Sequence, residues 1–161
     1  MNDRFSVRPG EARLKTALEY HERVTFIGHI ESPWDLGNCP KNLRQAREQS
    51  HLAALHLSEQ FRAGLEGIKA GDAVVLLYWM SEAPRDLIRQ APRHRDTGTG
   101  TFNLRSPARP NPIGMGVVRV LDIDVAAGRI RIDAIDAVNG TPLLDIKPHM
   151  PGADTVPGLS D

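Results

Sequence analysis

The sequence predicts a mainly β protein, built as a single barrel-like domain with one or two short helices. Short apolar runs with strand-like alternation recur along the 161 residues, turn signals separate them, and regular β–α alternation is missing. No Gly-x-Gly-x-x-Gly pattern follows a strand, which argues against a dinucleotide-binding fold of the Rossmann type. Because closure removes exposed strand edges, a barrel is the expected arrangement of these strands.

Two helices and two strands are predicted in the first part of the chain. A short helix is expected over Ala12–Tyr20 and a polar, weakly amphipathic helix over Lys41–Gln49. Val24–Glu31 alternates apolar and polar residues and predicts a strand. Ser32-Pro33 ends this strand, since the residue before a proline favours extended or turn geometry. Leu52–Leu57 is the next predicted strand.

The remaining part of the chain is predicted to be richer in strands. Ser58 is positioned to cap a short helix that runs through Gly64. Ala73–Met80 (AVVLLYWM) predicts a buried strand, whereas Pro84–Gly100 is basic and broken by prolines. Asn139-Gly140 indicates a turn, because both residue types tolerate positive φ. Further strands are predicted over Thr101–Leu104, Gly114–Ile123, Arg129–Ile135 and Leu143–Ile146.

Composition predicts a polar N-terminal extension at residues 1–22, a barrel domain at 23–152 and a flexible tail at 153–161. Apolar residues make up 40% of the chain, enough for one core. The longest apolar run, Ala73–Met80, is too short for a bilayer, which needs about 20 residues. The first ten residues lack a secretory signal, and Cys39 has no second cysteine to pair with. We therefore expect a cytoplasmic protein without a membrane anchor.

Charge is balanced overall but concentrated locally. The 20 basic and 20 acidic side chains cancel, so nonspecific coating of nucleic acid is not expected. Arg85–Arg109 nevertheless holds six arginines against Asp86 and Asp96. Such a patch could bind a phosphate backbone, or it could be an ordinary solvated face.

The segment Arg105–Gly114 (RSPARPNPIG) is the first that points to chemistry. Its three prolines fix φ and remove backbone donors, so a stiff irregular loop is expected rather than a central strand. The stiffness would hold Arg105, Arg109 and Asn111 in place. Arginine offers a planar fork of donors for carboxylate, phosphate or base edges, and asparagine offers both a donor and an acceptor. The alternative is a proline-rich surface loop with solvated arginines.

The second such segment is Ile135–His149 (IDAVNGTPLLDIKPH). Asp145 and Lys147 stand two residues apart, so on a strand their side chains share one face. They could form a catalytic pair or a structural ion pair beside a hairpin turn at Asn139-Gly140.

Metal and thiol chemistry have little support in the sequence. The six histidines lack the spacing of a zinc site, and one cysteine cannot supply a thiolate cluster, so no metal is expected. Cys39 has no visible base partner that would make it a nucleophile.

Together, RSPARPNPIG at 105–114 and NGTPLLDIKPH at 139–149 resemble the TsaA/TrmO family, also called YaeB-like or VirR-like. The resemblance covers residues 24–151, and GHIESPW, LHLSEQFRAGLEGI and VVLLYWM follow in the family's order. It implies a β-barrel-like domain that forms homodimers and binds S-adenosylmethionine. It also implies N6-methylation of threonylcarbamoyl-adenosine, the modified adenosine beside the tRNA anticodon, with tRNA as partner.

Matched position by position, the resemblance also implies a set of site residues. Asp136, Asp145 and Lys147 would be catalytic, with either carboxylate able to accept or orient a proton. Arg109 and Asn111 are expected to contact the substrate. The implied cofactor-binding residues are Pro40, Lys41, Asn42, Trp79, Met80, Arg105, Met115, Asn139, Gly140 and Thr141.

Departures from the family's pattern keep two other functions open. Lys41-Asn42 stands where the family has Arg-Gln, and lysine lacks the bidentate fork of arginine. Asn139 replaces an aspartate, His149 a tyrosine and Leu104 a threonine. The alternatives are a methyltransferase acting on a small molecule or another RNA, and a non-catalytic sensor or regulator that binds S-adenosylmethionine.

Overall fold

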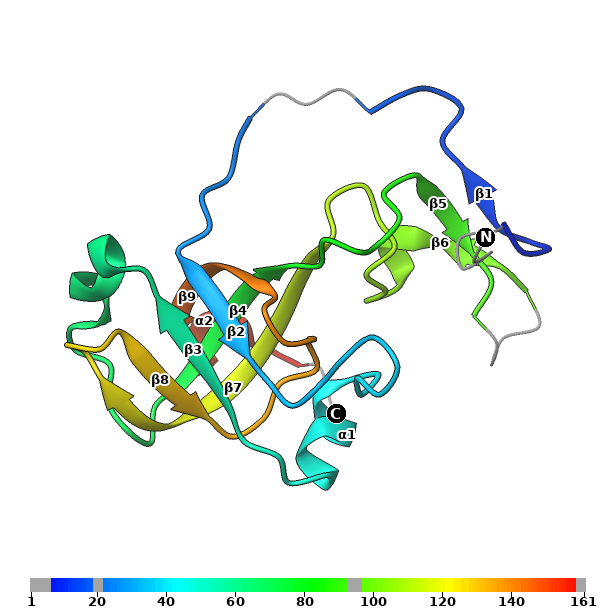
Figure 1. The fold of residues 1–161 in the computed structure, drawn as a ribbon. Coiled ribbons are helices and arrows are strands. Elements are labelled where there is room, and N and C mark those ends of the chain that lie inside the picture. The colour runs from blue at the N-terminus through cyan, green and yellow to red at the C-terminus, as the bar shows by residue number, and fades with distance from the viewer. Residues whose placement is uncertain (1–6, 19–21, 93–96, 159–161) are drawn as a thin grey trace. The chain divides into compact units, whose positions relative to one another are not determined.

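A computed structural model describes residues 7–18, 22–92 and 97–158 of the chain (Figure 1). The chain divides into two compact units. Met1–Val24 and Met80–Gly114 form one, here called the small-sheet unit, and Thr25–Trp79 and Met115–Asp161 form the other, the barrel unit. Neither unit is one continuous stretch of sequence, because the chain leaves the barrel unit after Trp79 and returns to it at Met115.

The barrel unit is built on a closed barrel with the strand order β2-β3-β8-β7-β4-β9 (Figure 1). The pairings of β2 with β3 and β9, of β8 with β3 and β7, and of β4 with β9 are antiparallel. The mainly β, barrel-like fold class predicted from sequence is therefore confirmed. The strands are β2 (Gly28–Glu31), β3 (Ala53–Leu57), β4 (Ala73–Trp79), β7 (Ile113–Asp124), β8 (Arg129–Ile132) and β9 (Pro142–Pro148).

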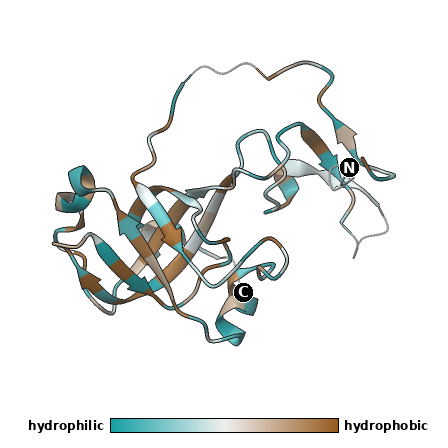
Figure 2. Ribbon diagram, in the orientation of Figure 1, coloured by the Kyte–Doolittle hydropathy of each residue, from teal (hydrophilic) through white to brown (hydrophobic). Residues whose placement is uncertain are grey.

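The barrel closes because alternate residues of its strands are apolar. Val74, Leu76 and Tyr78 of β4 are buried, while the residues between them are more exposed. Ile130 and Ile132 of β8 contribute to the same core. Figure 2 shows hydrophobic residues interspersed with hydrophilic ones along the barrel strands. Burying each large apolar side chain contributes about 1.5–3 kcal/mol, which offsets the conformational entropy lost on folding.

The register of β4 against β9 decides which side chains point out of the barrel. Ile146 lies opposite Leu76, whose side chain is buried in the core. Asp145 lies opposite Leu77 and Lys147 opposite Val75, so both belong to the outer face. The register shifts between Leu77 and Tyr78, where β9 carries one extra residue.

Helices of the barrel unit are short and tied to its strands. Helix α1 (Leu43–Glu48) falls within the predicted Lys41–Gln49, and the Asn42 side chain caps it by accepting from the Gln45 amide. The 3-10 helix η1 (Glu59–Leu65) follows Ser58, whose side chain makes no capping hydrogen bond. Helix α2 (Pro151–Asp154) was not expected; it begins with proline, a residue suited to the first helical turn.

Two predicted barrel strands are shorter in the structure. Val24–Glu31 is a strand only from Gly28, where a Cβ would lie 2.0 Å from the carbonyl oxygen of His56. Glycine thus permits the close approach of β2 to β3. Arg129–Ile135 is a strand only to Ile132, because the Asp133 amide bonds to the Arg119 carbonyl and the chain then turns away.

The small-sheet unit contains three short strands in the order β1-β5-β6. They are β1 (Ala12–Arg13), β5 (Leu87–Gln90) and β6 (Thr99–Gly100), and η2 (Thr101–Asn103) follows β6. The helix predicted over Ala12–Tyr20 is therefore wrong for residues 12–18. Pairing with β5 holds Ala12–Arg13 extended, and residues 14–18 form bends and irregular chain; residues 19–20 lie outside the described ranges. The strand predicted over Thr101–Leu104 is a 3-10 turn, closed by a hydrogen bond from the Leu104 amide to the Thr101 carbonyl.

No helix in the described ranges is long and apolar enough to cross a bilayer. Within those same ranges, no group of three or more histidine, cysteine, aspartate or glutamate side chains could hold a metal ion.

Candidate functional site

Two loops at one end of the barrel are joined by hydrogen bonds. One follows β2 and the other precedes β9. The Trp34 indole donates to the Ile135 carbonyl at 2.7 Å, and the Asn139 amide donates to the Trp34 carbonyl at 2.8 Å. Ser32 donates its amide to Asn139 Oδ1 at 3.2 Å and its hydroxyl to the Ala137 carbonyl at 2.7 Å. These contacts bring the Asn139-Gly140-Thr141 turn to the loop that leads into Pro40-Lys41-Asn42.

The Asn139-Gly140 turn forms as predicted. Gly140 has φ +81°, which a side chain would disfavour, and its amide donates to the Ile30 carbonyl at 2.8 Å. The Thr141 hydroxyl donates to the Val138 carbonyl at 2.7 Å. The turn does not make a β8–β9 hairpin, because β9 pairs with β2 and with β4. It instead sets the start of β9 against β2.

Pro40-Lys41-Asn42 forms the entry to α1. Pro40 is buried, and Lys41 is exposed with its amide donating to Gln45 Oε1 at 3.0 Å. Asn42 Oδ1 accepts from the Gln45 amide at 2.9 Å. This reciprocal arrangement satisfies two backbone donors that the start of a helix leaves unpaired. Asn42 therefore has a structural role that the sequence argument did not include.

Cys39 and Asp136, which belong to these two loops, form a group of titratable side chains with Tyr78 of β4. Tyr78 is the last buried residue of β4, and its hydroxyl donates to Asp136 Oδ1 at 2.9 Å. Burial, and then the charges of Asp136 and Asp35, raise the pKa of the Cys39 thiol to about 11. Cys39 is consequently a protonated thiol at neutral pH, and Asp136 lies close enough to influence it.

Asp145 and Lys147 form the ion pair that their spacing allowed. Lys147 Nζ lies 2.7 Å from Asp145 Oδ2, and the two side chains remain 61% and 43% exposed respectively. The other carboxylate oxygen of Asp145 accepts from the amide of Ile146 at 2.9 Å. This pair stands on the outer face of β9, whereas Asp136 is bonded by the buried Tyr78. Among the described residues, no hydrogen bond or ion pair joins Asp136 to Asp145 or Lys147.

The loop of residues 105–112, which contains the three prolines, lies in the small-sheet unit and is held by hydrogen bonds from other residues of that unit. Gln90, a buried residue of β5, donates to the Ala108 carbonyl at 2.6 Å. Arg85 Nε donates to the Pro110 carbonyl at 2.8 Å, and the Met80 amide donates to the Pro112 carbonyl at 2.9 Å. These contacts hold residues 105–112 as the irregular loop that the prolines predict.

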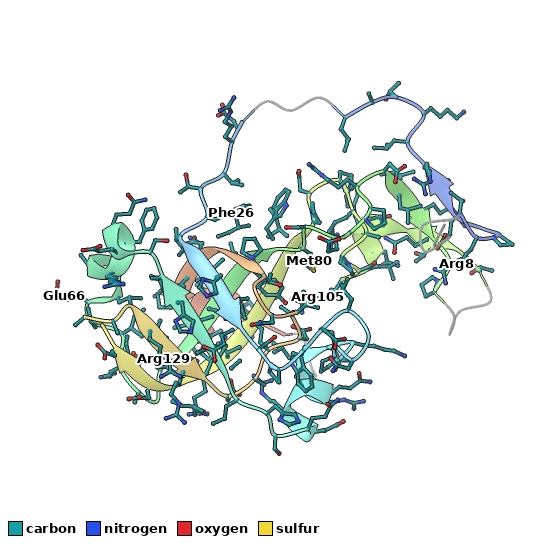
Figure 3. The ribbon with its side chains drawn as sticks, viewed as in Figure 1. Arg8, Phe26, Glu66, Met80, Arg105 and Arg129 are labelled. Atoms are coloured by element: carbon teal, nitrogen blue, oxygen red, sulfur yellow. The ribbon has the colours of Figure 1, made fainter. Side chains whose placement is uncertain are left out.

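The basic stretch is only partly a free charged surface. Arg85 Nη2 reaches Asn111 Oδ1 at 3.5 Å, and Arg89 donates to the Gly98 carbonyl at 2.7 Å. Arg105 is exposed and Arg109 half-buried in the same unit (Arg105 and Met80 are labelled in Figure 3). Residues 93–96, which include two of the six arginines, lie outside the described ranges.

The tRNA-methyltransferase O N-terminal domain matches residues 29–155. The chain belongs to this family. Two curated relatives of similar extent carry names of ligand-binding proteins. The "Probable S-adenosyl-L-methionine-binding protein VirR" of Rhizobium radiobacter is 36% identical over 88% of this chain and 79% of its own length. The "S-adenosyl-L-methionine-binding protein" of Archaeoglobus fulgidus is 35% identical over 81% of this chain and 91% of its own.

A solved structure of TrmO from Pseudomonas aeruginosa has the same fold, with 31% identity and a TM-score of 0.66. The match covers 88% of this chain and 62% of the TrmO chain, so this protein spans less than two thirds of that relative. The family resemblance deduced from the two motifs is thereby confirmed. The cofactor that it implied, S-adenosylmethionine, is the ligand in the names of the relatives.

The predicted TrmO-type site residues fall into two sets by unit. Those of the barrel unit are Pro40, Lys41, Asn42, Trp79, Met115, Asp136, Asn139, Gly140, Thr141, Asp145 and Lys147, and those of the small-sheet unit are Met80, Arg105, Arg109 and Asn111. Sequence reasoning missed Tyr78 and Gln90. Tyr78 is the polar side chain of an otherwise apolar strand, and Gln90 ends a short strand that also contains Arg89. A buried polar side chain needs a hydrogen-bond partner, and this requirement was the available signal.

Proposed function

We propose that this protein is an S-adenosylmethionine-dependent methyltransferase that N6-methylates threonylcarbamoyl-adenosine beside the tRNA anticodon. The observation that carries the proposal is the joining of the two barrel loops, since Asp136 and Asn139 come from one and Pro40–Asn42 follows the other. These segments are about 100 positions apart in sequence, both lie within the 29–155 stretch that matches the family, and they share one end of the barrel.

The chemistry of these side chains fits the cofactor. S-adenosylmethionine supplies an electrophilic methyl group on a positively charged sulfur when it is bound. We assign the half-buried Trp79 ring to contact with the adenine or the positively charged sulfonium. Arg105, with its planar fork of donors, is the proposed partner of the cofactor carboxylate. The remaining cofactor contacts would come from Pro40, Lys41, Asn42, Met80, Met115, Asn139, Gly140 and Thr141.

Asp136 is the carboxylate that we assign as proton acceptor. As the acceptor nitrogen gains a methyl group it must lose a proton, and Asp136 Oδ2 makes no hydrogen bond to any residue that the structure describes. Tyr78 orients this carboxylate through Oδ1. Asp145 is a weaker choice, because Lys147 already pairs with its Oδ2 and the Ile146 amide with its Oδ1. Arg109 and Asn111 remain the proposed substrate contacts.

The test is transfer of a labelled methyl group from S-adenosylmethionine to tRNA that carries threonylcarbamoyl-adenosine. Asp136→Asn should lower the transfer rate by about 100- to 10,000-fold, the usual range for losing a general base, while calorimetry gives a nearly unchanged cofactor Kd. Asp145→Asn is the matched control and should retain most of the rate. Equal losses in the two variants would contradict the assignment of Asp136. Cofactor binding without transfer to this tRNA would refute the substrate.

A sensor that binds the cofactor without turnover is the second candidate. It is favoured by Asn42 and Asn139, whose side chains are already engaged in a helix cap and in a contact with Ser32. Measurable methyl transfer to any acceptor excludes it. A screen in which only a small molecule or a different RNA is methylated would instead favour the remaining alternative, a methyltransferase with another acceptor.

We also propose that the protein is a homodimer. The outer face of β7 presents three exposed apolar side chains, Met115, Val117 and Leu121, which are separated along the strand by buried residues such as Val118 and Val120. A second copy would remove this surface from water. Light scattering on the purified chain should give twice the 17.7 kDa mass of the protomer, and the protomer mass itself would refute the proposal.

A further inference from the structure

The 3-10 helix η2 of the small-sheet unit places a buried and an exposed residue next to each other. Thr101 is 1% exposed, whereas Phe102 is 75% exposed, the largest exposed fraction among the large hydrophobic residues that the structure describes. A phenyl ring in water is unfavourable, so a ring that remains three-quarters exposed at this position calls for an explanation.

Hydrogen bonds on both sides of Phe102 hold its backbone in this orientation. The Thr101 hydroxyl donates to the Leu87 carbonyl at 2.9 Å and accepts from Gln90 Nε2 at 3.1 Å. On the other side, the Leu104 amide donates to the Thr101 carbonyl at 3.1 Å, and Asn103 Nδ2 donates to Thr99 Oγ1 at 3.2 Å. Turning the ring inward would break buried polar contacts, so the unit presents the ring outward as a fixed feature.

The charge of the same unit suits a polyanion. Arg89 is exposed on β5, and Arg109, a proposed substrate contact, is half-buried in the same unit. Asp86, the one acidic residue of the described part of the basic stretch, is paired with Arg13. A surface that offers an aromatic face among arginines is the combination by which proteins bind unpaired nucleotides.

We infer that Phe102 is a stacking platform for an unpaired base of the RNA acceptor, with arginines of the small-sheet unit contacting the phosphates. The inference rests on the proposed function, in which the acceptor adenosine lies next to a tRNA anticodon and therefore in a single-stranded loop. Stacking is favoured over burial against a second protein, because an apolar protein contact would gain nothing from the surrounding arginines. Phe102 is thereby a specificity-determining residue that recognises a loop rather than a duplex.

Fluorescence anisotropy of a labelled RNA hairpin with an unpaired loop tests this role. Phe102→Ala should weaken binding by about 5- to 150-fold, the loss expected for one stacked base. Phe102→Trp should retain or improve the affinity. Phe26→Ala is the matched control, since Phe26 is also exposed, at 46%, but belongs to the barrel unit and not to the unit that contains the arginine-rich stretch. The same strand annealed into a full duplex should bind the wild type and Phe102→Ala equally.

Two further measurements separate this inference from the proposed function. Cofactor affinity, measured by calorimetry, should be the same in Phe102→Ala and wild type. If wild type binds the hairpin but Phe102→Ala binds it as tightly, the stacking role is overturned while the proposed function stands. If wild type binds cofactor but no RNA, the tRNA acceptor and the stacking role both fail. If Phe102→Ala instead lowers the mass measured by light scattering, the ring contacts a second copy and the inference is wrong.

Discussion

The two units are held together by different interactions. In the barrel unit, antiparallel ladders close on a core of aliphatic side chains such as Leu76 and Ile130. In the small-sheet unit, short strands are supplemented by polar side chains, and Gln90 and Thr101 are buried with hydrogen bonds to backbone carbonyls. The difference shows that an apolar pattern is sufficient to indicate the first unit, whereas the second depends on directional contacts between residues distant in sequence.

The largest expected effect comes from the barrel core. Leu76→Ala removes a fully buried side chain and leaves a cavity, so the free energy of unfolding should fall by about 2–5 kcal/mol. Chemical denaturation followed by circular dichroism measures the change. Leu36→Ala, at an exposed position of the barrel unit, is the control and should change stability little. A loss no larger than that of the control would mean that the core does not hold the barrel.

The next effect concerns the reactivity of Cys39, at the loop end of the barrel. Because burial raises the pKa of this thiol from 9.0 to about 11, its thiolate fraction at pH 8 should be about 100-fold smaller than that of an ordinary thiol. Alkylation by iodoacetamide, followed by mass spectrometry, should be correspondingly slow in the folded protein and should accelerate up to about pH 11. Unfolded protein in denaturant provides the reference. Equal rates in both states would show that burial does not protect the thiol.

A smaller effect is expected in the polar network of the small-sheet unit. Gln90→Leu removes the donor to the Ala108 carbonyl and to the Thr101 hydroxyl, at a cost of about 1–3 kcal/mol for buried groups left unpaired. Hydrogen exchange should accelerate at residues 101–108. Exchange in β8 should stay unchanged if the two units differ as described. Faster exchange throughout the barrel would instead mean that the units share one cooperative network.

The smallest effect involves an exposed hydrogen bond between His56 and Glu31 on the outside of the barrel. His56 donates a hydrogen bond to the Glu31 carboxylate, and this bond lowers the pKa of Glu31 from 4.5. Slight burial of the carboxyl raises the pKa, but its effect is smaller than that of the hydrogen bond. A carboxyl with a lowered folded-state pKa stabilises the fold above pH 4.5 and loses that contribution as the pH falls through the folded value. Glu31→Gln should therefore cost less than about 1 kcal/mol at pH 7.

The pH dependence provides the check on the Glu31 prediction. The difference in unfolding free energy between wild type and Glu31→Gln should shrink as the pH is lowered below 4.5, measured by denaturant titration at several pH values. A difference that grows on acidification would assign the effect to something other than the carboxylate.

Prediction from sequence succeeded where one residue type controls the local structure. The apolar run Ala73–Met80 became β4, the prolines of residues 105–112 kept that loop irregular, and Gly140 adopted positive φ. It failed at Thr101, whose β-branched side chain favours a strand by propensity but whose hydroxyl is drawn to the Leu87 carbonyl. It also missed β5, because the flanking prolines and arginines concealed a strand of four residues.

The sequence by itself determined the family, the barrel class and the two motifs, because these follow from local residue order and from alternation along single strands. Tertiary structure decided which carboxylate faces which partner. Asp136 and Asp145 look equivalent along the chain, yet the register of β9 against β4 directs Asp145 to Lys147 on the outer face, while the hydroxyl of buried Tyr78 reaches Asp136. Strand register and loop-to-loop hydrogen bonds are long-range properties, and local sequence patterns do not encode them.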